Sequence, residues 1–163
     1  MDIQPASLEK TKLTKLGINF DALSRYDVIC LPENVFLAEK VEDLHDADDS
    51  SHLAKLLKAS DVRCATALDL GLDVPFLERR SNDIWLGVIW VVGTCVVIPV
   101  IKDVISKLIT SKLDKKPDDH VTSTVHLDLY IERGPNVVKL SYKGDGKTLS
   151  KVLKSIVPEE EAS

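Results

Sequence analysis

The chain has 163 residues, of which 44% are hydrophobic and 29% are charged, and its net charge at pH 7 is −5. This length allows one ordinary domain or two very small ones. The composition excludes a protein with many membrane spans, and the acidic balance argues against nucleic acid as a partner, because nucleic-acid-binding proteins present a basic face. The cysteines Cys30, Cys64 and Cys95 form no CxxC pair and no zinc pattern, so we expect reduced thiols.

The N-terminal region, residues 1–78, is expected to form a small soluble domain that is α/β or mostly helical. Its first residues are polar, so we expect no secretory signal. Apolar spacing and turn residues predict a helix over Ser7–Leu16, a strand over Tyr26–Leu31, helices over Val35–Leu44 and His52–Ala59, and a strand or short helix over Val62–Leu70.

A cluster of acids and histidines lies in the middle of this region, in the sequence HDADDSSH. Imidazole and carboxylate groups both suit divalent metals, but the spacing matches no established ligand pattern. The pattern favours a solvated loop whose acids cap the following helix, and no metal or other cofactor is expected. The members of the cluster are His45, Asp46, Asp48, Asp49 and His52.

A catalytic nucleophile is the other chemistry that the region could carry. Cys30 or Cys64 would need a histidine and an acid close in space, and His52 is the available histidine. Nothing in the local sequence supports such a triad. We therefore expect that the protein is not an enzyme.

The segment Ile84–Ile101 (IWLGVIWVVGTCVVIPVI) is apolar throughout and has charged residues on both sides. A transmembrane helix needs about 20 apolar residues, and a tryptophan such as Trp85 is common at the membrane interface. We therefore predict one membrane span within residues 79–116, in which Trp85, Gly87, Gly93 and Pro99 shape the packing of the helix. The alternative is a buried core segment, since β-branched and aromatic residues favour strands in water.

The distribution of basic residues predicts the orientation of this span. Only Arg79 and Arg80 precede it closely, whereas lysines are frequent from Lys102 to Lys116. Basic residues accumulate on the cytoplasmic side of a membrane, so a single-pass protein with a cytoplasmic C-terminal side is expected. The basic residues do not determine the side of the membrane on which the N-terminal domain lies.

The helix is predicted to continue past the apolar run as an amphipathic extension to Leu113. Apolar residues recur at i, i+3, i+4 and i+7, as on one face of a helix. Such a stripe needs a partner, which is either the same helix in a second copy or the chain's own C-terminal part. The stripe consists of Ile101, Val104, Ile105 and Leu108.

The C-terminal module, residues 117–163, has the clearest pattern. Thr124–Arg133 alternates between apolar and polar residues, Val137–Lys143 is the returning strand, and Lys147–Ile156 carries an apolar helical stripe. Such a ββα unit cannot bury enough surface alone, so its sheet must pair with another strand, and its edge can dock a partner protein. The polar face offers a possible ligand surface made of His126, Tyr130, Lys139 and Lys143.

An apolar helix followed by VHLDLYIERGPNVVKLSYKGDGKTLSKVLKSI resembles the effector-associated constant component type of accessory membrane proteins in bacterial conflict and defence systems. The resemblance covers residues 84–157 at most and rests on pattern. It implies an accessory or effector role without catalysis.

Two functions are expected from these features. The first is an α+β single-pass membrane protein that contacts lipid, forms homo-oligomers and binds a partner or signal through its soluble modules. The alternative is a soluble α/β adaptor whose apolar run is core and whose ββα unit mediates protein–protein interaction.

Overall fold

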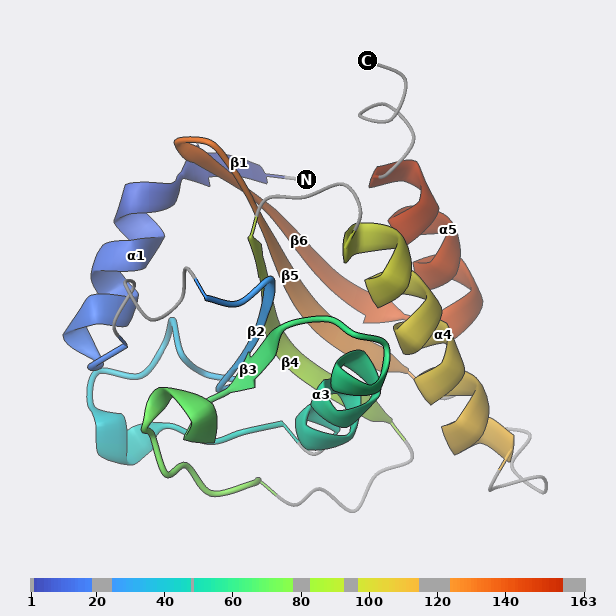
Figure 1. Cartoon of the computed structure of the whole chain (residues 1–163), viewed down its shortest axis with the longest axis horizontal. Helices are drawn as coiled ribbons and strands as arrows, with labels where there is room; N and C mark the ends of the chain where they lie inside the picture. The colour runs from blue at the N-terminus through green and yellow to red at the C-terminus, as the bar shows by residue number, and fades with distance from the viewer. Residues whose placement is uncertain are drawn as a thin grey trace.

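A mixed six-stranded sheet organises the chain (Figure 1). The computed structural model describes residues 2–18, 25–47, 49–77, 83–92, 97–114 and 124–156, and these form an α+β fold. The strands are β1 (Asp2–Pro5), β2 (Val28–Leu31), β3 (Cys64–Thr66), β4 (Ile84–Val92), β5 (Val125–Arg133) and β6 (Asn136–Gly144). The α-helices are α1 (Ala6–Lys15), α3 (Ser50–Ala59), α4 (Val97–Asp114) and α5 (Gly146–Ile156).

The strand order is β1-β6-β5-β4-β2-β3, so the sheet takes strands from all three predicted segments of the chain. β4 lies inside the sheet, parallel to β5 and antiparallel to β2. The outer strands add the antiparallel pairs β5–β6 and β6–β1 and the parallel pair β2–β3. The ββα unit therefore pairs within the chain, with β4 along β5 and with β1 along the first part of β6.

The prediction of one continuous helix from Ile84 to Leu113 is wrong, because its first part is the strand β4. Residues of β4 are buried on both faces of the sheet, which explains why the segment shows no alternation of polar and apolar residues. Its valines, isoleucines and tryptophans have high strand propensity. In the described part of the chain, no helix has the length and apolar character that crossing a membrane requires.

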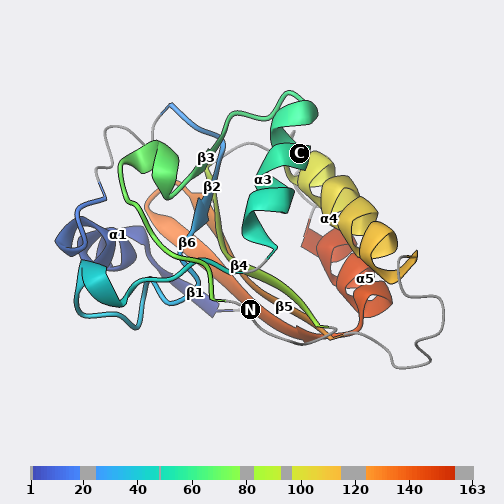
Figure 2. The same cartoon turned by 90° about the horizontal axis from the view of Figure 1, so that it is seen from below.

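The second part of the apolar run belongs to α4, and its predicted stripe is buried within the chain. Ile101, Val104, Ile105 and Leu108 are at most 2% exposed. They share one core cluster with residues of α3, α5 and the sheet, on the face that these three helices cover (Figure 2). Of the two partners considered for this stripe, the structure therefore shows the one within the same chain. Pro99 lies in the first turn of α4, where a proline is tolerated.

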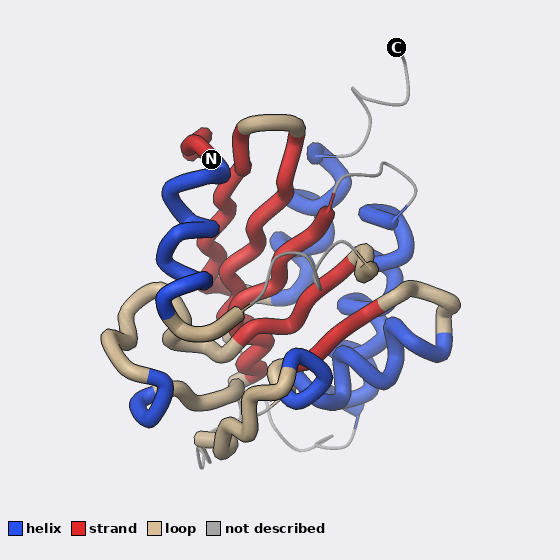
Figure 3. The backbone as a smooth tube through the Cα atoms, turned by 60° about the vertical axis from the view of Figure 1, so that its left-hand side comes forward, coloured by secondary structure: helices blue, strands red, loops and turns tan. Residues whose placement is uncertain are grey.

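The opposite face of the sheet is covered by α1 and by the loop after β2 (Figure 3). Leu13 and Leu16 from the α1 region pack in a second core cluster with Trp90 of β4 and Tyr130 of β5. This cover reaches only part of the face. The remaining part, near the start of β4 and the end of β6, contains the pocket described below.

The other predicted elements are mostly present. The ββα unit is confirmed as β5, a turn at Gly134 and Pro135, β6 and α5. The helix predicted over Val35–Leu44 is wrong, since this stretch contains turns and a short 3-10 helix. The side chain of Asn34 explains the difference: it donates to the carbonyl of Asp43 at 2.8 Å and accepts from the amide of His45 at 3.0 Å. Such local bonds compete with helix formation.

Candidate functional site

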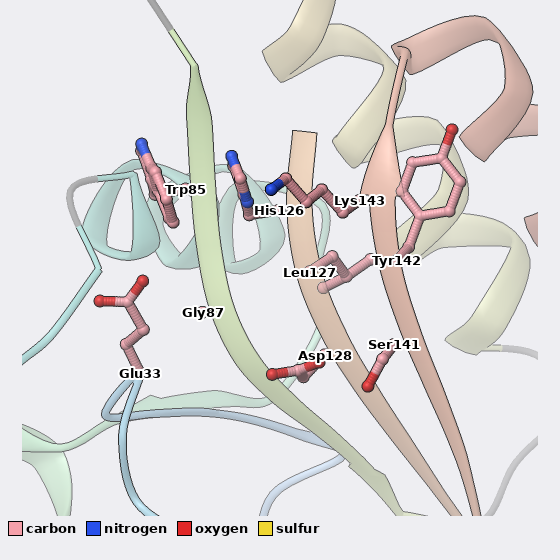
Figure 4. Close-up of a pocket in the computed structure, with 9 residues that line it drawn as sticks. All are labelled: Glu33, Trp85, Gly87, His126, Leu127, Asp128, Ser141, Tyr142 and Lys143. Atoms are coloured by element: carbon pink, nitrogen blue, oxygen red, sulfur yellow. The ribbon is translucent and has the colours of Figure 1, made fainter. Parts of the chain in front are cut away.

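A pocket of about 290 Å³ opens on the partly covered face of the sheet (Figure 4). It crosses three adjacent strands, β4, β5 and β6, and the loop after β2 closes one side. Most of its lining residues carry polar or charged side chains, in contrast to the two core clusters. The lining residues are Glu33, Trp85, Gly87, His126, Leu127, Asp128, Ser141, Tyr142 and Lys143.

Two stacked rings form one end of the pocket. Trp85 and His126 are paired neighbours on β4 and β5, and their rings lie parallel, with centroids 3.6 Å apart and an interplanar angle of 2°. His126 Nε2 is 2.9 Å from a carboxylate oxygen of Asp83, whose other oxygen accepts a bond from the amide of Thr124. The bond from His126 holds the pKa of Asp83 below its usual value. The imidazole is thus fixed on two sides.

Asp49 fixes the backbone beneath the indole. Its carboxylate accepts a hydrogen bond from the amide of Trp85 at 2.8 Å, and its own amide donates to the carbonyl of Trp85 at 3.0 Å. The sequence favoured a helix-capping role for the acids here, but the side chain of Asp49 makes no capping bond to α3. It ties α3 to the start of β4 instead.

The next rows of the sheet supply the charges of the pocket. Lys143 pairs with His126 across β5 and β6, and its amine extends toward the imidazole (Figure 4). Asp128 pairs with Ser141 one row further. Glu33 enters from the loop after β2, with its carboxylate 2.9 Å from Nε2 of His45. Carboxylates therefore outnumber cationic groups around the pocket.

The predicted ligand face is present, but the structure divides it in two. His126 and Lys143 line the pocket, whereas Tyr130 is buried against Phe36 and Trp90. Lys139 lies over the Tyr130 ring, with its amine 5.6 Å from the centroid.

Of the predicted helix-packing residues, two belong to this site. Trp85 forms the stack, and Gly87 lines the pocket. Pro99 lies in α4, and Gly93 lies outside the described residues.

Several site residues were missed by sequence reasoning. Asp128 and Ser141 lie on the same face as His126 and Lys143, so the alternation along the two strands was a usable signal. Asp83 and Glu33 had no such signal, because they are close to the site only through the pairing of distant strands and the path of a loop.

The HDADDSSH cluster is divided among different roles. His45 pairs with Glu33, Asp49 holds Trp85, and His52 is exposed on α3. Asp48 lies outside the described residues. In the ranges that the structure describes, no group of three or more histidine, cysteine or acidic residues is arranged to hold a metal ion.

The two described cysteines lie together in the core. Cys30 on β2 and Cys64 on β3 are both buried, with their sulfurs 3.8 Å apart. The hydrogen bond with Cys64, and then burial, raise the pKa of Cys30 well above its usual value. A buried thiol of this kind does not present a thiolate to a substrate. Cys95 lies outside the described residues.

Asp46 gives a prediction for stability against pH. Burial raises the pKa of its carboxyl to about 6, above the value of 3.8 in the unfolded chain. The folded state therefore binds more protons between pH 4 and 6, and the free energy of unfolding falls as pH rises through this window. We expect Asp46→Asn to increase the free energy of unfolding at pH 7 by about 1 kcal/mol, after allowance for solvent screening.

Urea unfolding at pH 4.5 and pH 7 checks this effect. The gain from Asp46→Asn should be present at pH 7 and mostly absent at pH 4.5. Asp43→Asn, on an exposed neighbour in the same loop, is the matched control and should change neither value. An equal gain at both pH values would show that ionisation of Asp46 is not the cause.

Comparison with known proteins adds no relative: no protein-family model, curated protein or solved structure matches this chain. The accessory role, the membrane location and the homo-oligomer stay predictions.

Proposed function

We propose that the chain is a protein-binding module that adds an extended segment of a partner to the free part of β6. One observation carries this proposal. β1 pairs with Asn136–Lys139 only, so among the described residues no strand lies beside 140–144 of β6. An open strand edge presents unpaired amide and carbonyl groups, which an extended peptide can satisfy.

The hairpin determines which backbone groups face this open edge. A two-residue turn joins Arg133 to Asn136, so these two residues form a hydrogen-bonded pair, and such pairs recur at every second position along the ladder. Asn136, Val138, Leu140 and Tyr142 therefore bond toward β5. Ser141 and Lys143 direct their amide and carbonyl groups outward. The side chains of the same two residues line the pocket.

The opposite edge of the sheet is a poorer docking site. β3 has three residues and is followed almost at once by a short 3-10 helix. The pocket borders β6 and not β3. Backbone pairing would give affinity at β6, and the pocket beside it would give selectivity among side chains.

Selection from a library of random heptapeptides tests the proposal. Ser141→Pro removes an outward amide, and proline is tolerated at a strand edge. We expect selected peptides to lose about tenfold in affinity for Ser141→Pro, which corresponds to one or two ladder hydrogen bonds. Ser141→Ala keeps the amide and removes the hydroxyl, so it should bind nearly as well as the unaltered protein.

Two results would contradict the proposal. One is a library that yields no peptide that binds the unaltered protein. The other is a set of peptides that bind the unaltered protein and Ser141→Pro equally. Circular dichroism and thermal unfolding establish that Ser141→Pro is folded before either result is interpreted.

A further inference from the structure

We propose that the pocket binds the guanidinium group of an arginine side chain presented by the strand that pairs with β6. This inference rests on the proposed strand addition and states what the added strand must carry. The site is the part of the pocket bounded by Asp128 and Ser141.

Charge balance around the pocket favours a cation. Two carboxylates, those of Glu33 and Asp128, line it, and Asp83 lies directly behind His126. Lys143 is the lining lysine, and its amine extends toward the imidazole of His126 at the stacked end of the pocket (Figure 4).

The carboxylate of Asp128 has no cationic partner among the described residues. Glu33 pairs with His45, and Asp83 pairs with His126. Among the described residues, no lysine, arginine or histidine lies within ion-pair distance of Asp128, although its side chain is only half-buried and borders the pocket. A carboxylate in this setting is a natural acceptor for a cationic group from outside the chain.

The geometry suits arginine better than a compact amine. A guanidinium is planar and bonds a carboxylate in a bidentate manner. Asp128 offers the carboxylate and Ser141 a hydroxyl beside it, while the indole of Trp85 is already stacked on His126 (Figure 4). A methylated or bulky cation would lose the paired hydrogen bonds.

The distance from an added strand to Asp128 also fits the length of an arginine side chain. An added strand would lie two interstrand spacings from β5, which is about 10 Å. Its side chains on the pocket face would extend over Ser141 toward Asp128, because side chains of adjacent strands on one face project side by side. An arginine is long enough to cross β6 and meet a carboxylate that rises from β5.

A small probe separates the pocket from the strand edge. N-acetyl-arginine methylamide carries the side chain without a strand, and N-acetyl-citrulline methylamide is its neutral match. In amide-proton NMR titrations, the arginine probe should shift the resonances of Asp128 and Ser141. It should bind at least about fivefold more tightly than the citrulline probe. Asp128→Asn should abolish this preference, and Asp103→Asn on α4 should preserve it.

The same variants applied to heptapeptide binding complete the test. Selected peptides should share an arginine at one position, and that preference should disappear with Asp128→Asn while the loss caused by Ser141→Pro remains. Equal binding of the two probes, or selection of acidic or apolar residues at that position, would overturn the arginine site. Because Ser141→Pro would still reduce peptide binding in that case, strand addition would stand. If Ser141→Pro did not reduce peptide binding, while Asp128→Asn still abolished the arginine preference, the proposal of strand addition would be overturned.

Discussion

Replacing Trp90 with alanine should lower the free energy of unfolding by about 3 to 5 kcal/mol. The indole is 1% exposed and lies against Tyr130, with ring centroids 5.6 Å apart, in the core cluster beneath α1. Its removal leaves a large cavity in close-packed surroundings that cannot collapse completely. Chemical denaturation followed by circular dichroism measures the change.

The second tryptophan of the same strand is the matched control. Trp85 is only half-buried, because its ring lies in the pocket against His126. Trp85→Ala should therefore cost clearly less stability than Trp90→Ala, while it should weaken binding in the pocket. Similar small losses for both variants would contradict the placement of β4 as an internal strand, since a span facing lipid would tolerate either change similarly.

Gly87→Ala should destabilise the fold by about 2 to 4 kcal/mol, for two separate reasons. Gly87 has φ +74°, a conformation that costs an L-residue about 1–2 kcal/mol. An added Cβ would also lie 3.1 Å from the Cβ of Ala47. Ala47 cannot move freely, because its carbonyl accepts a bond from the Ser50 hydroxyl and its preceding residue bridges to Phe76.

Two further variants separate these causes. Gly71→Ala carries the conformational cost alone, since Gly71 has φ +88° and nothing lies within 4 Å of its added Cβ. It should cost about 1–2 kcal/mol. Ala47→Gly combined with Gly87→Ala should recover the steric part, which a double-mutant cycle measures. No recovery in the double variant would mean that the contact with Ala47 contributes nothing to the effect of Gly87→Ala.

The position of Gly87 is linked to the pocket. The pairing of β4 with β5 shifts by one residue between Trp85 and Gly87, so Leu86 is the extra residue of a β-bulge. Bulges change the direction of side chains and are frequent beside functional sites. The bulge keeps Trp85 opposite His126 on the pocket face while Leu86 remains in the core.

The sequence predicts the C-terminal part of the fold well, for a physical reason. In β5, Val125, Leu127 and Leu129 alternate with His126 and Asp128, because one face meets the helices and the other carries polar groups. The apolar run is ambiguous because a strand buried on both faces and a transmembrane helix are both apolar throughout. Its length, its charged flanks and Trp85 favoured the helix, whereas its β-branched residues favoured the buried strand that residues 84–92 form.

Part of the candidate site could be located in the same way. His126 and Lys143 follow from alternation along single strands, and they line the pocket as neighbours. The bond between Asp49 and Trp85 and the pairing of Glu33 with His45 depend on how the N-terminal loops lie against the sheet. No local sequence pattern predicts such long-range contacts, so these residues could be assigned to the site only from the structure.

Hydrogen exchange of the β6 amides, with and without a selected heptapeptide, tests the central claim most directly. Strand addition predicts slower exchange at Ser141 and Lys143, whose amides face the open edge. It predicts little change at Leu140 and Tyr142, which already bond toward β5. Protection at the β3 edge instead, or no protection at Ser141 and Lys143 in a saturated complex, would contradict the claim that this chain binds its partner through β6.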